Sequence, residues 1–169
     1  MPLSENIKNE KYFMRAALRR AKTAAKQGET PVGCVIVKDG RIIAGGRNKR
    51  ENGKNALYHA EIEAIGKACK KLGGWRLHMC DLYVTLEPCP MCAGAIINAR
   101  IKNVYYGASD SKAGSFGSVT DLSELGYNHK PCVHKGVLED ECASVLRDFF
   151  KELRNSKKIK KQDSSEVDA

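Results

Sequence analysis

The chain has 169 residues, enough for one domain with a buried core, and its 42% hydrophobic and 29% charged residues are ordinary for a globular protein. No apolar run is long enough to span a membrane, and residues 1–6 lack the layout of a secretory signal, so we expect a cytoplasmic protein with no membrane partner. The net charge is +9, and residues 154–169, with five basic and three acidic side chains, carry only +2 of it, so the basic body favours a polyanionic partner such as nucleic acid.

Apolar residues recur at three- and four-residue steps in four segments and form short β-type runs in five others. In chain order, we predict a helix over 4–27, strands over 32–38 and 41–46, a helix over 59–72, a strand over 81–86, a helix over 89–99, strands over 103–108 and 133–137, and a helix over 138–153. A hairpin followed by strand–helix alternation predicts an α/β fold. We expect a three-layer α/β/α domain with a mixed five-stranded central sheet and helices on both faces.

No linker or internal repeat divides the chain. We therefore predict one domain over residues 1–153, followed by a basic, disordered C-terminal tail over residues 154–169. The segment 109–128 is predicted to be a long loop, and loops of this length are usually lids or binding loops. Seven cysteines in a chain with no export signal predict free thiols and metal ligands rather than disulfides.

Two of the predicted helices begin at potential metal ligands. His59-Ala60-Glu61 begins one, and Pro88-Cys89-Pro90-Met91-Cys92 leads into the other. Helix N-termini favour thiolates, and cysteines three residues apart lie on one face of a helix. The ligands His59, Cys89 and Cys92 would hold a zinc ion with one tetrahedral position open for water, as in catalytic zinc sites.

Glu61 follows the predicted ligand His59 by two residues. A carboxylate in this place can act first as general base and then as general acid towards a water molecule and a departing amine. H-x-E combined with P-C-x-x-C is the pattern of zinc enzymes that deaminate nucleobases. The two motifs therefore predict hydrolytic removal of an amino group from a ring.

Two other interpretations of the motifs stay open. The zinc could be structural, with a fourth ligand from Cys80, His78, Cys132 or His134. Alternatively, the histidine could be a core residue beside a Cys-x-x-Cys that binds no metal.

Several segments point to one family. They are Pro31-Val32-Gly33, Asn48, His59-Ala60-Glu61, residues 82–96 around the two cysteines, Gly107-Ala108 and Asp148-Phe149-Phe150. Over residues 10–154 the chain resembles the bacterial tRNA-specific adenosine deaminases of the cytidine deaminase-like superfamily. It departs from that family at Asn55-Ala56-Leu57-Tyr58, which bears on one edge of the pocket and not on the zinc ligands or Glu61.

The resemblance implies a cytidine deaminase-like fold and a homodimer with one Zn²⁺ per subunit. It implies conversion of adenosine to inosine at the wobble position of a tRNA anticodon stem-loop. The substrate contacts that it implies come from Asn48, the Ala60 backbone, the segment from Glu29 to Val32, Asp110 and Phe149.

Two further functions remain possible on the sequence alone, because the same chemistry acts on adenine, cytosine and guanine. One is a deaminase of a free purine base or nucleoside such as guanine. The other is a catalytically idle RNA-binding module that keeps zinc for structure. The basic body and the Asp110 segment favour an RNA substrate, whose unstacked bases can be read in pockets.

Overall fold

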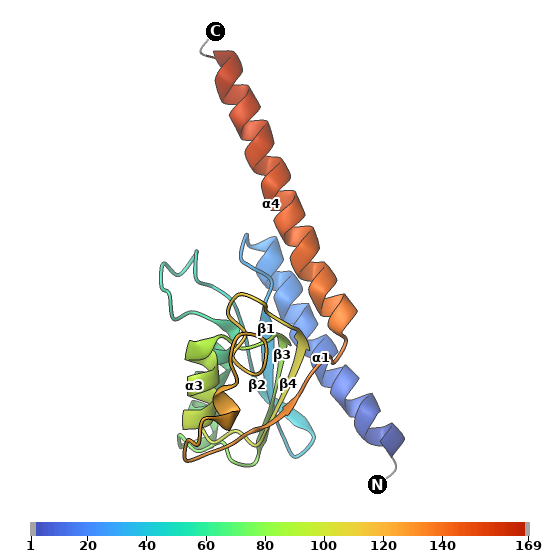
Figure 1. Cartoon of the computed structure of the whole chain (residues 1–169), viewed down its shortest axis with the longest axis vertical. Helices are drawn as coiled ribbons and strands as arrows, with labels where there is room; N and C mark the ends of the chain where they lie inside the picture. The colour runs from blue at the N-terminus through green and yellow to red at the C-terminus, as the bar shows by residue number, and fades with distance from the viewer. Residues whose placement is uncertain (1–2, 168–169) are drawn as a thin grey trace.

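One mixed sheet forms the centre of the structure, a computed structural model that describes residues 3–167 (Figure 1). Its elements in chain order are α1 (Leu3–Lys26), β1 (Gly33–Lys38), β2 (Arg41–Arg47), α2 (Ala60–Leu72), β3 (Cys80–Leu86), α3 (Pro90–Asn98), β4 (Asn103–Ala108), the 3₁₀ turn η1 (Leu122–Glu124), β5 (Cys132–His134) and α4 (Glu139–Val167). The strand order is β2-β1-β3-β4-β5, with β1 antiparallel to β2 and β3, and β4 parallel to β3 and β5. The predicted α/β fold with a mixed five-stranded sheet is confirmed.

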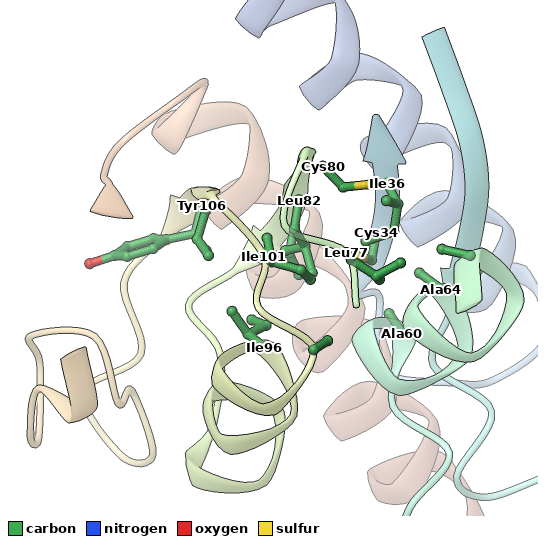
Figure 2. Packing of buried hydrophobic residues seen from close by; sticks show 14 of the residues in the cluster. Cys34, Ile36, Ala60, Ala64, Leu77, Cys80, Leu82, Ile96, Ile101 and Tyr106 are labelled. Atoms are coloured by element: carbon green, nitrogen blue, oxygen red, sulfur yellow. The ribbon is translucent and has the colours of Figure 1, made fainter. Parts of the chain in front are cut away.

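The central strands are buried on both faces, and their side chains alternate between two cores. Cys34 and Ile36 of β1 belong to the core beneath α2 and α3, part of which Figure 2 shows. Val35 and Val37 belong instead to the core beneath α1 and α4. Because successive side chains of a strand point to opposite faces, each central strand contributes to both cores, and the helices that cover the two faces form the outer layers.

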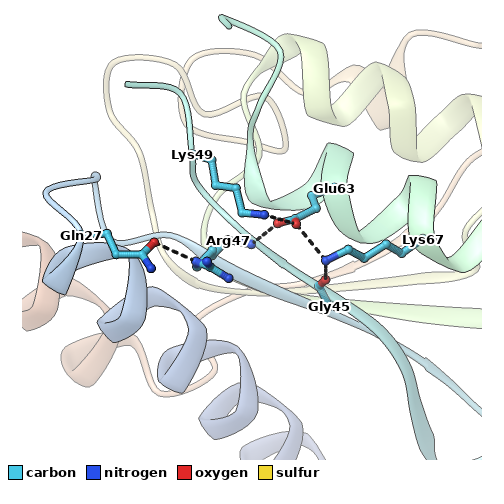
Figure 3. Close-up of polar contacts among 6 residues, drawn as sticks. All are labelled: Gln27, Gly45, Arg47, Lys49, Glu63 and Lys67. Atoms are coloured by element: carbon cyan, nitrogen blue, oxygen red, sulfur yellow. Dashed lines mark hydrogen bonds and ion pairs between the residues drawn. The ribbon is translucent and has the colours of Figure 1, made fainter. Parts of the chain in front are cut away.

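The contact between α2 and β2 fixes the helix that begins at the predicted zinc ligand. A Cβ atom at Gly46 would lie 2.2 Å from the Ala60 carbonyl oxygen, so only glycine allows this approach. Glu63 of α2 also accepts hydrogen bonds from the Arg47 N–H at 2.9 Å and from Lys49 Nζ at 2.6 Å (Figure 3). These contacts hold the first turn of α2 at the end of the sheet.

The last helix differs from its predicted extent. Instead of ending at Leu153 before a disordered tail, α4 continues to Val167. Residues 154–167 contain no glycine or proline and are rich in lysine, which is a good helix former. This end of α4 projects beyond the sheet and the other helices (Figure 1). Within residues 3–167, no helix has the length and apolar character needed to cross a membrane.

Candidate active site

The two ligand-bearing motifs meet because both lie at helix starts. His59 is the residue before α2 and Cys89 the residue before α3; both have extended backbone, and neither side chain caps its helix. Pro90 occupies the first turn of α3, where a missing N–H costs nothing. The imidazole and the thiol are therefore free to turn towards a common point.

The three predicted ligand atoms have the spacing that a zinc ion requires. His59 Nδ1 lies 3.6 Å from the Sγ of Cys89 and 3.6 Å from the Sγ of Cys92. Zinc–nitrogen and zinc–sulfur bonds of about 2.0 and 2.3 Å at a tetrahedral angle would separate such atoms by about 3.5 Å. These residues therefore fit a zinc ion and leave one tetrahedral position for another ligand.

No fourth protein ligand joins this cluster within the described part of the chain. Cys80 begins β3, whose other end leads to Cys89, so about 20 Å of strand separates them. Cys132 and His134 lie on β5, where His134 stacks on the ring of Tyr105. None of the residues considered for a structural site thus occupies the open position.

Glu61 lies beside the ligand cluster and is 4% exposed. Burial raises the pKa of Glu61 to about 7, so its carboxyl group can accept and release a proton near neutral pH. The pKa of the Cys89 thiol is shifted in the opposite direction, because the hydrogen bonds with Cys92 and His59 lower this pKa to about 4. Cys89 is therefore readily available as the thiolate, the form that binds zinc.

A pocket of about 220 Å³ opens onto these groups. The predicted residues that it brings together are Val32, Asn48, His59, Ala60, Glu61, Cys89 and Asp110. Thr30, within the segment 29–32 that the family resemblance placed at the pocket, also lines it. Arg50, Leu86, Glu87 and Ala113 line it too, and the sequence analysis assigned them no role in the site. The volume is below the range of about 300–1,000 Å³ that is usual for drug-sized ligands and suits a single base.

Glu29 is not among the lining residues. Its side chain is fully buried, and its carboxylate accepts hydrogen bonds from the N–H groups of Glu51 at 3.2 Å and Asn52 at 2.6 Å. Nearby, Asn48 donates to the Thr30 carbonyl at 3.3 Å. The Glu29 carboxylate therefore holds the segment 48–58 from behind the pocket.

Glu87 has the same role towards the opposite wall of the pocket. Its carboxylate accepts hydrogen bonds from the N–H groups of Asp110 at 3.0 Å, Phe116 at 3.1 Å and Ser118 at 3.1 Å, and from the Ser118 hydroxyl. Burial alone would raise the pKa of Glu87, but these bonds lower it. A Cβ atom at Gly114 would lie 2.3 Å from this carboxylate, so the loop is folded closely around it.

Two other predicted features lie away from the pocket lining. Phe149 on α4 is half-buried and packs edge to face on Phe150, with ring centroids 5.4 Å apart. Leu57 and Tyr58, in the segment that departs from the family pattern, line a separate hollow of about 340 Å³ with Ile62 and Glu63.

In sequence, this chain is similar to deaminases. Residues 8–154 match the family model described as MafB19-like deaminase. A tRNA-specific adenosine deaminase of Bacillus subtilis is 46% identical over 158 residues, which are 93% of this chain and 98% of the relative. One from Agrobacterium fabrum is 47% identical over 144 residues, which are 85% of this chain and 95% of the relative.

Two solved structures resemble the chain to different degrees. A structure from a study of A-to-I editing by tRNA:A34 deaminases at the wobble position of transfer RNA has a TM-score of 0.77 at 46% identity, covering 80% of this chain and 99% of that chain. A structure of guanine deaminase from Nitrosomonas europaea has a TM-score of 0.70 at 23% identity, covering 82% and 83%. The second likeness concerns the fold alone.

Proposed function

Because the chain belongs to the tRNA-specific adenosine deaminases within the MafB19-like deaminase family, we propose that it converts adenosine to inosine at the wobble position of a tRNA anticodon. The observation that carries this proposal is the pocket itself. It combines a three-ligand cluster that fits zinc with a buried carboxylate, in a volume suited to one base. An idle RNA-binding module would need no such carboxylate beside an open ligand position.

The site would hold one Zn²⁺ per subunit on His59 Nδ1 and on the sulfurs of Cys89 and Cys92. When bound, zinc supplies a Lewis acid that lowers the pKa of a water molecule to about 7. Glu61 would take a proton from the attacking water as the water oxygen bonds to C6 of the base, and would deliver that proton to the ring nitrogen N1. Glu61 then carries the second water proton to the amino group, the C–N bond breaks, and ammonia leaves.

Other lining residues would hold the base in place. Val32 and Ala60 provide apolar walls, and the Ala60 N–H, in the first turn of α2, has no partner within the helix. Asn48 supplies an amide at the pocket edge, while Asp110 on the opposite wall contacts a neighbouring nucleotide. Glu29 contributes indirectly by holding the segment 48–58, and Phe149 stays a proposed contact from α4.

An RNA substrate agrees with the size of the pocket and with the charge. A base fits this pocket only when it leaves the helical stack, and a loop offers such bases. The net charge of +9 favours a phosphate backbone over a neutral free base.

We also propose that the protein is a homodimer and that it is cytoplasmic. The exposed apolar side chains of Leu57 and Tyr58 support the dimer.

The test compares RNA with free purines. Zinc-loaded protein is incubated with a tRNA that carries adenosine at the wobble position, and separately with free guanine and free adenosine. Inosine at that single position, read by reverse-transcription sequencing, is the expected result. Rapid turnover of free guanine with no change in the RNA would assign the pocket to a free-base deaminase instead.

A further inference from the structure

Basic side chains form a line along one face of α4. Arg147, Lys151, Arg154 and Lys158 follow one another at steps of four, three and four residues. This spacing returns to the same side of a helix at every step. We call these four residues the α4 basic stripe; it is about 16 Å long, given the rise of a helix.

The stripe begins next to the active-site pocket. Arg147, Lys151 and Arg154 line a hollow of about 640 Å³ that Lys112 borders from the opposite side. Lys112 lies between Asp110 and Ala113, both of which line the active-site pocket. The same short segment therefore separates the pocket from the hollow.

The charges of the stripe are available to a partner. All four side chains are exposed, and none forms an ion pair within the part of the chain that the structure describes. Among the described residues, Asp148 is the one acidic residue that lines the hollow. The outer half of α4 projects past the body at the same end of the molecule as the segment 48–58 (Figure 1).

We propose that the α4 basic stripe binds the phosphate backbone of the paired stem beside the RNA loop that enters the pocket. The inference rests on the proposed function and extends it from the reacting base to the stem. A base held in the pocket places the adjoining backbone at the segment 110–113. From there, a straight row of cations leads away from the protein. Evenly spaced cations on a rigid helix match the regular phosphates of a stem better than the irregular backbone of a loop.

The test uses two double variants of the full-length, zinc-loaded protein. Lys151→Gln/Lys158→Gln removes two charges from the stripe, and Lys157→Gln/Lys160→Gln removes two from other faces of the same helix. All four lysines are exposed, and glutamine is a good helix former, so net charge and helicity are matched. Binding is measured over a salt series with two hairpins that share an anticodon loop and differ in stem length.

The stripe variant should bind the long-stem hairpin about tenfold more weakly. The slope of log K against log[salt] should decrease in magnitude by about 2, one for each lost phosphate contact. The control variant should stay within about twofold of the unchanged protein. If both variants weakened binding equally, or if neither did, the proposed role of the stripe in binding the stem would be overturned. Deamination of the hairpins by the unchanged protein is recorded in parallel, so its absence would instead count against the proposed function.

Discussion

Cys89 and Cys92 differ in exposure but have the same distance to His59 Nδ1. Replacing Cys89 with alanine removes one of the three proposed ligands, so Cys89→Ala should lose zinc and the stability that zinc contributes. Cys132→Ala is the matched control, because Cys132 is exposed on β5. Zinc content by atomic absorption should fall to near zero in the first variant and stay unchanged in the second. Stoichiometric zinc in Cys89→Ala would remove Cys89 from the ligand set.

Glu87 is a positioning residue for the loop that carries Asp110. In Glu87→Gln, one carboxylate oxygen becomes an NH₂ group that faces backbone N–H donors, which should cost about 1–3 kcal/mol. Because the wall of the pocket shifts while the zinc ligands stay in place, KM for RNA should rise more than kcat falls. Glu124→Gln breaks only an exposed pair with Lys130 and should change neither constant. A KM that is unchanged in Glu87→Gln would contradict this role.

At the level of elements, Glu63 joins α2 to the end of β2. Burial opposes ionisation, but the hydrogen bonds from Lys49 and Lys67 lower the pKa of Glu63 to about 2. A carboxyl group with a lowered pKa in the folded state stabilises the protein above its usual pKa, and that stability is lost as the pH falls from about 4.5 towards 2. Lys49 and Lys67 are partly exposed, so solvent screening reduces the effect to about 1–2 kcal/mol.

Urea unfolding of Glu63→Gln should therefore show a loss of about 1–2 kcal/mol at pH 7 relative to the unchanged protein, and a clearly smaller loss near pH 2.5. Glu141→Gln is the control, because its pair with Arg15 is 3.9 Å long and exposed. A constant difference across this pH range would show that Glu63 acts through packing rather than charge.

Two glycine substitutions, one at the contact between β2 and α2 and one away from it, should change the stability in opposite directions. Gly46→Ala places a Cβ atom 2.2 Å from the Ala60 carbonyl and should destabilise the protein by about 1–3 kcal/mol, because neighbouring backbone must move. Gly66→Ala on α2 meets no atom within 4 Å and should stabilise it by about 0.5–1 kcal/mol. Since Ala60 lies in the pocket, Gly46→Ala should also slow deamination. Similar melting temperatures for the two variants would refute this account of the contact.

The strands and the ligand cluster could be predicted from the sequence because their signals are local. A short continuous run of apolar residues marks β1, and the two short motifs lie at helix starts. Glu87 could not be selected in the same way, since its partners lie 23 to 31 residues further along the chain. The extension of α4 was not predicted because a lysine-rich segment has no apolar face to bury and was assigned to a disordered tail. Lysine is nevertheless a good helix former.

At the scale of the whole molecule, the proposed catalytic pocket and the proposed RNA-binding stripe lie in adjoining regions. The starts of α2 and α3 hold the ligand cluster and Glu61 at one end of the sheet. The loop held by Glu87 separates this pocket from the hollow beneath α4. A base and its neighbouring backbone could thus be bound at the same time by separate parts of one domain.

The most direct test of this account is a single-turnover assay of Glu61→Gln beside the unchanged protein. Both are loaded with zinc and mixed with a tRNA that carries adenosine at the wobble position. The unchanged protein should form inosine at that position, and the variant should be slower by about 10²–10⁴-fold while keeping its zinc and its fold, because only the proton carrier is lost. A variant that forms inosine at an undiminished rate would contradict the role of Glu61. An unchanged protein that holds zinc but forms no inosine would contradict the proposed reaction.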